Sequence, residues 1–290
     1  FEDIRDTVHA QADPEKLDTL VIINLCVPTA SGVPLQLLPK VINGVRIIGI
    51  DVPGFGVPTH AEAKDVLAAA MLRYAMRNNM VPVLVTEKPD LFGDMYRDLR
   101  DIGVPEMLGR EPRMFITNTG ETIPLDEEAL NWKQEADAAR EAGEPVPPRR
   151  GRFLTGGGKA KQDKVMQALA SGEPTGSGEL PDVIFSTYDQ MNTVKGATTP
   201  RRQFLSAVAE RALFAFDESH NAGGVAPTGW ESKNRTPNRS EFVRDLATRA
   251  KGVIFSSATY AKRPDVMDLY ARTDRSEEHT SELQSLRHIS

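Results

Sequence analysis

The chain of 290 residues contains a single cysteine, so it cannot form an internal disulfide bond. Cys26 lies in the apolar run LVIINLCV, where we expect a buried structural thiol rather than a nucleophile. A lone buried thiol fits a reducing compartment. The run is too short to cross a bilayer, and the acidic, polar first residues do not resemble a signal peptide. These absences predict a cytoplasmic (intracellular) protein with no membrane contact.

An excess of positive charge is also lacking, because 35 Lys and Arg residues face 41 Asp and Glu residues and give a formal net charge of −6. Such a protein has no overall attraction for nucleic acids or anionic membranes, so any nucleic acid must be held in a local groove. Histidines are few and scattered, and none has the Cys/His spacing of a zinc site. They are His9, His60, His220, His279 and His288.

Short apolar runs alternate with stretches of helical periodicity, a pattern typical of an α/β fold with a mostly parallel sheet. The strand-like runs are 19–27, 45–52, 81–88, 182–190, 212–216 and 252–259, and the helical stretches are 61–79, 201–211 and 240–250. Residues from about 118 to 180 are rich in proline, glycine and charge. This region is predicted to be a loop-rich insertion with two helices.

Four of the apolar runs pass into polar residues at their C-terminal ends: 81–88, 182–190, 212–216 and 252–259. In an open parallel sheet the carboxyl ends of the strands line one crevice, and ligands bind there. The four polar ends are therefore predicted to converge on one site. The simpler alternative, that every strand must end in something polar, explains one or two such ends better than four.

An acidic pair follows the run 212–216 directly, as Asp217 and Glu218, and Ser219 and His220 come next. Hydrolysis of a magnesium-bound nucleotide needs this arrangement. Asp217 would hold Mg²⁺, often through its waters. Glu218 would orient and deprotonate the attacking water, with His220 just beyond the γ-phosphate. The alternative is that the pair begins a solvated loop.

A second group of small hydroxyl residues, SSATY at 256–260, follows the next strand-like run along the chain. Such residues can hydrogen-bond to an acidic motif on an adjacent strand. Turns rich in Ser and Thr are common on their own, so the weight of this segment comes from its position, one helix and one strand after the acidic pair.

The words DESH (217–220) and SAT (257–259) together resemble the motif II and motif III pair of superfamily 2 helicases. Three longer words, AFDESHNAGG, SSATYAKRPDVMDLYART and VTEKPDLFGDMYRDLRDIG, resemble the strawberry-notch-like branch of that superfamily. The resemblance covers roughly residues 61–274, apart from the insertion. It implies a RecA-like, mostly parallel β-sheet with helices on both faces, in an ATP-dependent helicase or translocase that uses ATP and Mg²⁺ and acts on DNA or RNA.

The resemblance also implies roles for single residues. Asp217 and Glu218 match the magnesium-binding and water-activating carboxylates. Ser257, Ala258 and Thr259 match the motif that couples hydrolysis to movement. Hydroxyls, amides and a lysine can hold phosphates without reading sequence, and the implied nucleic-acid contacts are Thr86, Lys88, Thr187, Tyr188 and Gln190.

The phosphate-binding loop departs from the family pattern. A diagnostic loop reads G-x-x-x-x-G-K-[ST], whereas the corresponding slot holds GIDVPGFGVPTHAEAK. Gly54 and Gly56 can bend such a loop and are the weak candidates for cofactor contacts, and a helix N-terminus follows to attract anions. Val57 and Pro58 stand where a lysine and a hydroxyl residue are wanted, and a proline lacks a backbone donor.

A second glycine-rich stretch, Gly156 to Lys159, precedes a helical stretch. Ala160 replaces the Ser or Thr that would hold Mg²⁺, so we expect a flexible basic loop there rather than a phosphate site. The domain prediction is therefore a divergent or foreign N-terminal segment (1–60), a RecA-like ATP-binding domain (61–274), and a tail (275–290) that resembles a translated sequencing adapter.

The helicase interpretation requires a second RecA-like domain of the parent chain, which this sequence lacks. The chain alone is therefore expected to be a fragment that hydrolyses ATP poorly or not at all. The missing Gly-Lys supports an alternative from another class, a non-catalytic RecA-like scaffold that binds nucleic acid or a protein partner.

Overall fold

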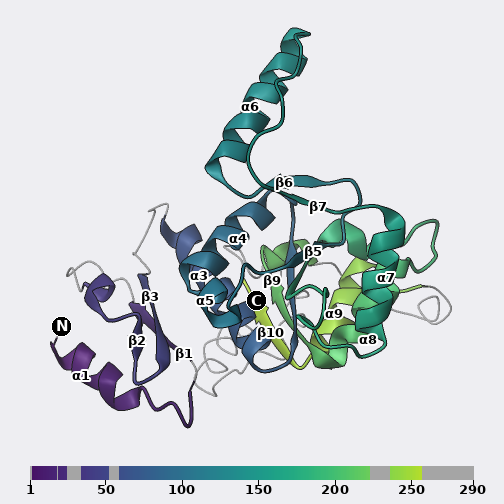
Figure 1. Cartoon of the computed structure of the whole chain (residues 1–290). Helices are drawn as coiled ribbons and strands as arrows, with labels where there is room; N and C mark the ends of the chain where they lie inside the picture. Colours follow the sequence, from purple (N-terminus) through teal and green to yellow (C-terminus); the bar gives the residue numbers. More distant parts are fainter. Residues whose placement is uncertain (1, 18, 25–33, 52–58, 223–235, 257–290) are drawn as a thin grey trace, which may run out of the picture.

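The computed structural model describes residues 2–17, 19–24, 34–51, 59–222 and 236–256 (Figure 1). Its larger sheet has five strands in the order β10-β9-β4-β8-β5, and every pairing is parallel. The strands are β4 (Val81–Thr86), β5 (Met114–Ile116), β8 (Val183–Thr187), β9 (Ala212–Phe216) and β10 (Gly252–Phe255). The predicted α/β fold with a mostly parallel sheet is confirmed.

Helices cover both faces of this sheet. Side chains point alternately to the two faces of each strand, and here both faces carry apolar side chains that the helices bury. Val83 and Phe214 pack with α7 (Lys159–Ala170), α8 (Pro200–Val208) and α9 (Arg239–Arg249) on one face. Leu84 and Phe185 pack on the other face with α3 (Thr59–Arg77) and α4 (Leu91–Asp101), which the short α5 (Val104–Leu108) follows. All six residues of β4 are buried, as expected for a central parallel strand.

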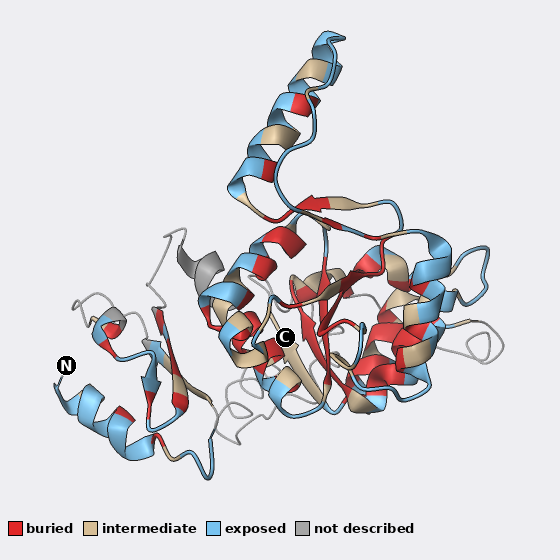
Figure 2. Cartoon of the chain, viewed as in Figure 1, coloured by how far each residue is buried: buried red, intermediate tan, exposed pale blue. Residues whose placement is uncertain are grey.

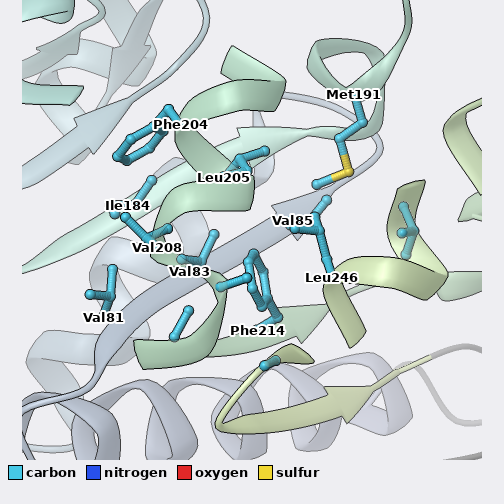
Figure 3. Close-up of a cluster of buried hydrophobic side chains, with 14 of the residues drawn as sticks. Val81, Val83, Val85, Ile184, Met191, Phe204, Leu205, Val208, Phe214 and Leu246 are labelled. Carbon is cyan, nitrogen blue, oxygen red and sulfur yellow. The ribbon is translucent and has the colours of Figure 1, made fainter. Parts of the chain in front are cut away.

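The core on the first of these faces is shown in Figure 3. Val81, Val83 and Val85 of β4 lie beside Phe214 of β9, and Leu205 of α8 and Leu246 of α9 cover them. The ring of Phe214 also stacks on that of Phe216, with centroids 5.4 Å apart. The apolar runs in the sequence thus become the buried centre of the molecule.

A second, smaller sheet has the order β1-β3-β2, from β1 (Thr19–Asn24), β3 (Val45–Asp51) and β2 (Val41–Ile42). The first pairing is parallel and the second antiparallel. Asn43 and Gly44 join β2 to β3 with positive φ angles of 51° and 85°, as a tight hairpin turn requires. The helix α1 (Glu2–Gln11) and the short 3₁₀ helix η1 (Leu35–Leu37) contribute to a separate small core with this sheet.

Within region 118–180, a helical arm projects from the body of the molecule (Figure 1). A two-stranded antiparallel sheet of β6 (Thr122–Pro124) and β7 (Phe153–Thr155) forms its base, and α6 (Glu127–Ala142) forms the arm. Asp126 caps α6 by accepting a hydrogen bond from the Ala129 N–H. Most of the arm is exposed (Figure 2). The division of the chain into domains stays a prediction.

No helix in the described part of the chain is long and apolar enough to cross a membrane. The predictions for Cys26, for the adapter-like tail 275–290 and for His279 and His288 concern residues outside the described ranges.

Candidate functional site

The parallel register brings the carboxyl ends of the strands to one edge of the five-stranded sheet. Thr86 at the end of β4 lies opposite Thr187 at the end of β8. On the other side of β4, Val85 lies opposite Phe216, and the next N–H of β9, that of Asp217, donates to the Val85 carbonyl at 2.8 Å. β10 follows β9 in the sheet, and its next residue, Ser256, donates its N–H to the Phe216 carbonyl at 2.9 Å.

The acidic pair sits on a sharp turn at this edge. Asp217 is only 8% exposed. Glu218 has a φ angle of 46°, in the left-handed region that non-glycine residues seldom occupy. The 3₁₀ helix η4 (Ser219–Ala222) follows, and the Ser219 N–H donates to the Ser256 carbonyl at 2.9 Å. The turn is thus fixed to the neighbouring strand at the carboxyl edge of the sheet.

The Glu218 carboxylate has a partner of its own. Its Oε2 atom lies 3.3 Å from Nδ1 of His220, and both side chains are about three-quarters buried. A histidine at this distance can hydrogen-bond to the carboxylate and fix its orientation, as in catalytic sites where a further residue orients the general base. The structure thus brings Glu218 and His220 together, while Asp217, the third residue predicted to be catalytic, lines a small cavity that neither of them lines.

A small cavity of about 20 Å³ lies beside the Asp217 carboxylate. It has room for about one water molecule or one small ion, and it is too small for a nucleotide. Asp65, Asp94 and Thr86 also line it with oxygen-bearing side chains, beside four apolar residues. The Asp94 carboxylate is also paired with Arg97. Oxygen ligands suit Mg²⁺, which usually binds through one or two carboxylates while keeping several waters.

Across the described residues, no group of three or more His, Cys, Asp or Glu side chains is arranged to hold a metal ion. A preformed cage of protein ligands is therefore excluded for that part of the chain. An Mg²⁺ ion beside Asp217 would therefore be held mainly by that one carboxylate and by its own waters.

The hydroxyls at the ends of β4 and β8 are engaged within the protein. Thr86 is 1% exposed, and its Oγ1 donates to the Lys88 carbonyl at 2.9 Å. Thr187 is 2% exposed, and its Oγ1 accepts from Nδ2 of Asn118 at 3.1 Å. These two side chains, and that of the buried Tyr188, offer almost no surface to an external partner. Of the five predicted nucleic-acid contacts only Lys88 is exposed, while Gln190 is half-buried.

Tyr188 has a role that the sequence did not reveal. Its hydroxyl donates to the backbone carbonyl of Asp217 at 3.0 Å, across from β8 to β9. Its ring stacks on Phe216 with centroids 6.5 Å apart. No sequence signal identifies this contact, because the acceptor is a backbone atom.

Gln162 of α7 was also not identified from the sequence. It is 1% exposed, and its Nε2 donates to the carbonyls of Ile116 and Gly156 at 3.2 and 2.8 Å. Its Oε1 accepts from Nη2 of Arg201 at 3.1 Å. This network ties the Gly156–Lys159 stretch to the end of β5. Gln162 therefore has a packing role. The sequence does not indicate this role, because Gln162 is one of several polar residues in α7.

The remaining predicted site residues lie outside the described ranges. They are Ser257, Ala258 and Thr259 of the coupling motif and Gly54 and Gly56 of the weak cofactor loop.

Comparison with known proteins gives a different relationship from the one that the motif words implied. No family model matches the chain. A chlorophyllide reductase 52.5 kDa chain from Rhodobacter capsulatus is 62% identical over 142 residues, covering 46% of this chain and 27% of the relative. The protein of the same name from Cereibacter sphaeroides is 77% identical over 75 residues, covering 26% of this chain and 15% of the relative. The chain thus spans about a quarter or less of the length of these curated relatives.

These matches overturn the resemblance to strawberry-notch-like superfamily 2 helicases. The helicase or translocase function is wrong, and so are DNA or RNA and a second RecA-like domain as partners. The physical reason is that the quoted words end buried parallel strands. Polar and acidic residues gather at that edge in open α/β sheets of many functions, so the words reported the fold and not the activity. Over the matched stretches, the chain is similar to chlorophyllide reductase chains.

Proposed function

We propose that this chain takes part in the reduction of chlorophyllide, as a portion of one chain of a multi-chain reductase. The observation that carries this proposal is the 62% identity over 142 residues to a curated chlorophyllide reductase chain. Identity at that level over so many residues far exceeds what a shared α/β fold requires, because unrelated sequences adopt the same fold. The partners that follow are the other chains of that enzyme.

Co-purification tests the proposed partnership. The tagged chain is co-expressed with the remaining chains of the Rhodobacter capsulatus chlorophyllide reductase, and the material that the tag retains is identified by mass spectrometry. We expect those chains to be retained above the level seen with the same tag on an unrelated α/β protein. Equal recovery with both baits would contradict the proposal.

For the sheet edge, we propose the binding of a magnesium-bound nucleotide such as ATP. Asp217 would hold the ion beside the small cavity, and the oxygen donors there fit that metal. A bound nucleotide would supply a hydrolysable phosphate bond. Glu218, oriented by His220 at 3.3 Å, would accept the proton of a water. Any nucleotide contacts of Gly54 and Gly56 stay a prediction.

Calorimetric titration with ATP, with and without Mg²⁺, tests this site. The Asp217→Asn variant should lose the magnesium-dependent part of the affinity, whereas Glu218→Gln should keep binding. Asp137→Asn is the matched control, because Asp137 lies on the exposed arm and pairs with Arg140 at 2.5 Å. Equal affinities for the variants at Asp217 and Asp137 would exclude Asp217 as the metal ligand.

A further inference from the structure

The hydroxyl of Tyr188 joins the ends of two neighbouring strands. Tyr188 begins the 3₁₀ helix η2 (Tyr188–Met191) directly after β8, and it is 2% exposed. Its hydroxyl donates to the Asp217 carbonyl at 3.0 Å, and this bond is buried. Since the ring also stacks on Phe216, the hydroxyl is held in place by packing as well as by its acceptor.

The Asp217 carbonyl belongs to the peptide that leads into Glu218. Glu218 adopts a left-handed φ of 46°, a conformation that is unfavourable for a non-glycine residue. Such a conformation persists only where the surroundings hold it. Here the Tyr188 hydroxyl holds the carbonyl before Glu218, and the Ser256 carbonyl accepts from the N–H of Ser219 after it at 2.9 Å. The turn is therefore clamped on both sides.

We propose that Tyr188 is a positioning residue for the acidic pair, which fixes the backbone turn that presents the Glu218 carboxylate at the sheet edge. Tyr188 acts through the Asp217 carbonyl. The functional importance of this role rests on the proposed nucleotide site. The structural role, a clamp on the turn, is independent of what binds there.

Tyr188→Phe removes the hydroxyl and keeps the ring. Tyr96→Phe is the matched control, because Tyr96 on α4 is also 2% exposed and its hydroxyl donates to Oε2 of Glu111 at 2.9 Å, away from the acidic pair. Amide hydrogen exchange at Ser219, followed by NMR on the full chain, reports the clamp. We expect exchange at least about fivefold faster in Tyr188→Phe, since a buried carbonyl loses its donor, and unchanged in Tyr96→Phe.

Equal exchange at Ser219 in the two variants would overturn the proposal, as would faster exchange that is matched across the whole sheet, because that reports global destabilisation. Titration of the same proteins with ATP and Mg²⁺ separates the two ideas. If exchange changes as expected but the unaltered chain does not bind Mg²⁺–ATP, the clamp stands and the nucleotide assignment fails. If the chain binds, Tyr188→Phe should weaken the magnesium-dependent affinity and Tyr96→Phe should not.

Discussion

The Asp182→Ala variant should be much less stable than the unaltered chain and should unfold at a lower urea concentration. Asp182 lies just before β8, and its side chain is 3% exposed. It accepts hydrogen bonds from Nη1 and Nη2 of Arg110 at 2.6 and 2.7 Å and from the Arg113 N–H at 2.7 Å. The hydrogen bond to Asp182 raises the pKa of Arg110 above its ordinary value, because the carboxylate stabilises the charged guanidinium. The carboxylate therefore anchors the segment after α5 to the start of a central strand.

The expected magnitude follows from what the substitution leaves behind. Breaking a buried ion pair by removing one partner costs about 3–5 kcal/mol. The Arg110 side chain is 37% exposed and can regain water, so we expect the lower end, about 3 kcal/mol. With a urea m-value of about 3 kcal/mol/M, the unfolding midpoint should fall by about 1 M without a change in m.

Urea unfolding followed by circular dichroism measures this shift. Asp137→Ala is the control, since the pair of Asp137 with Arg140 lies on α6 with both side chains about half exposed, and such surface pairs contribute about 0–1 kcal/mol. If Asp182→Ala unfolds at the same urea concentration as Asp137→Ala, the anchoring role is refuted.

Three further predictions concern the core, the arm and the glycine-rich stretch. Phe214→Ala should destabilise the chain by about 3–5 kcal/mol in the same assay, because Phe214 is fully buried in the centre of the sheet. The Ala129 N–H holds the pKa of Asp126 below its ordinary 3.8, so its cap is present above that pH and is lost as the pH falls through the lowered pKa; NMR titration of the Asp126 carboxyl measures it. Gly156→Ala should destabilise the chain, since an added Cβ would lie 2.1 Å from a carbonyl oxygen. Gly158→Ala meets nothing within 4 Å and should cost less than about 1 kcal/mol.

Each of these has a clear opposing result. A loss below about 1 kcal/mol for Phe214→Ala would mean that the face of the sheet covered by α7, α8 and α9 is not closely packed around Phe214. A carboxyl of Asp126 that titrates at or above 3.8 would deny the cap. Equal melting temperatures for the two glycine variants would show that Gly156 is not in close contact with the Asn118 carbonyl.

The sequence predicted the central strands well because their apolar runs are long enough to be recognised. The predicted strands near β4, β8, β9 and β10 all pair in parallel, and the described parts of their polar ends reach one edge as expected. β5, β6 and β7 have three residues each, too few for hydrophobic periodicity to show. Two helices were expected in the proline- and charge-rich region 118–180, and α6 and α7 lie there, but composition alone does not give their bounds.

The residue types of the site were predictable from the sequence, but its tertiary contacts were not. Asp217 and Glu218 stand out in the sequence because two charged residues directly follow a buried strand. Their position at the carboxyl edge of the sheet follows from the parallel arrangement of the strands. The clamp by Tyr188 depends on a backbone acceptor, and burial of Thr86 and Thr187 depends on packing across strands. Neither is visible in residue types alone. The predicted helicase function was wrong because the sequence motifs at the carboxyl edge occur in a fold that serves many activities.

The most direct test of the proposed function is an exchange of segments. The 142-residue stretch that this chain shares at 62% identity with the Rhodobacter capsulatus chlorophyllide reductase chain is placed into that chain in exchange for its own. The hybrid is assembled with the other chains of the enzyme, and chlorophyllide reduction is followed by its absorbance change. We predict a hybrid that assembles and turns over within about tenfold of the parent, a difference of about 1.4 kcal/mol. A hybrid that folds and assembles but reduces no chlorophyllide would contradict the account.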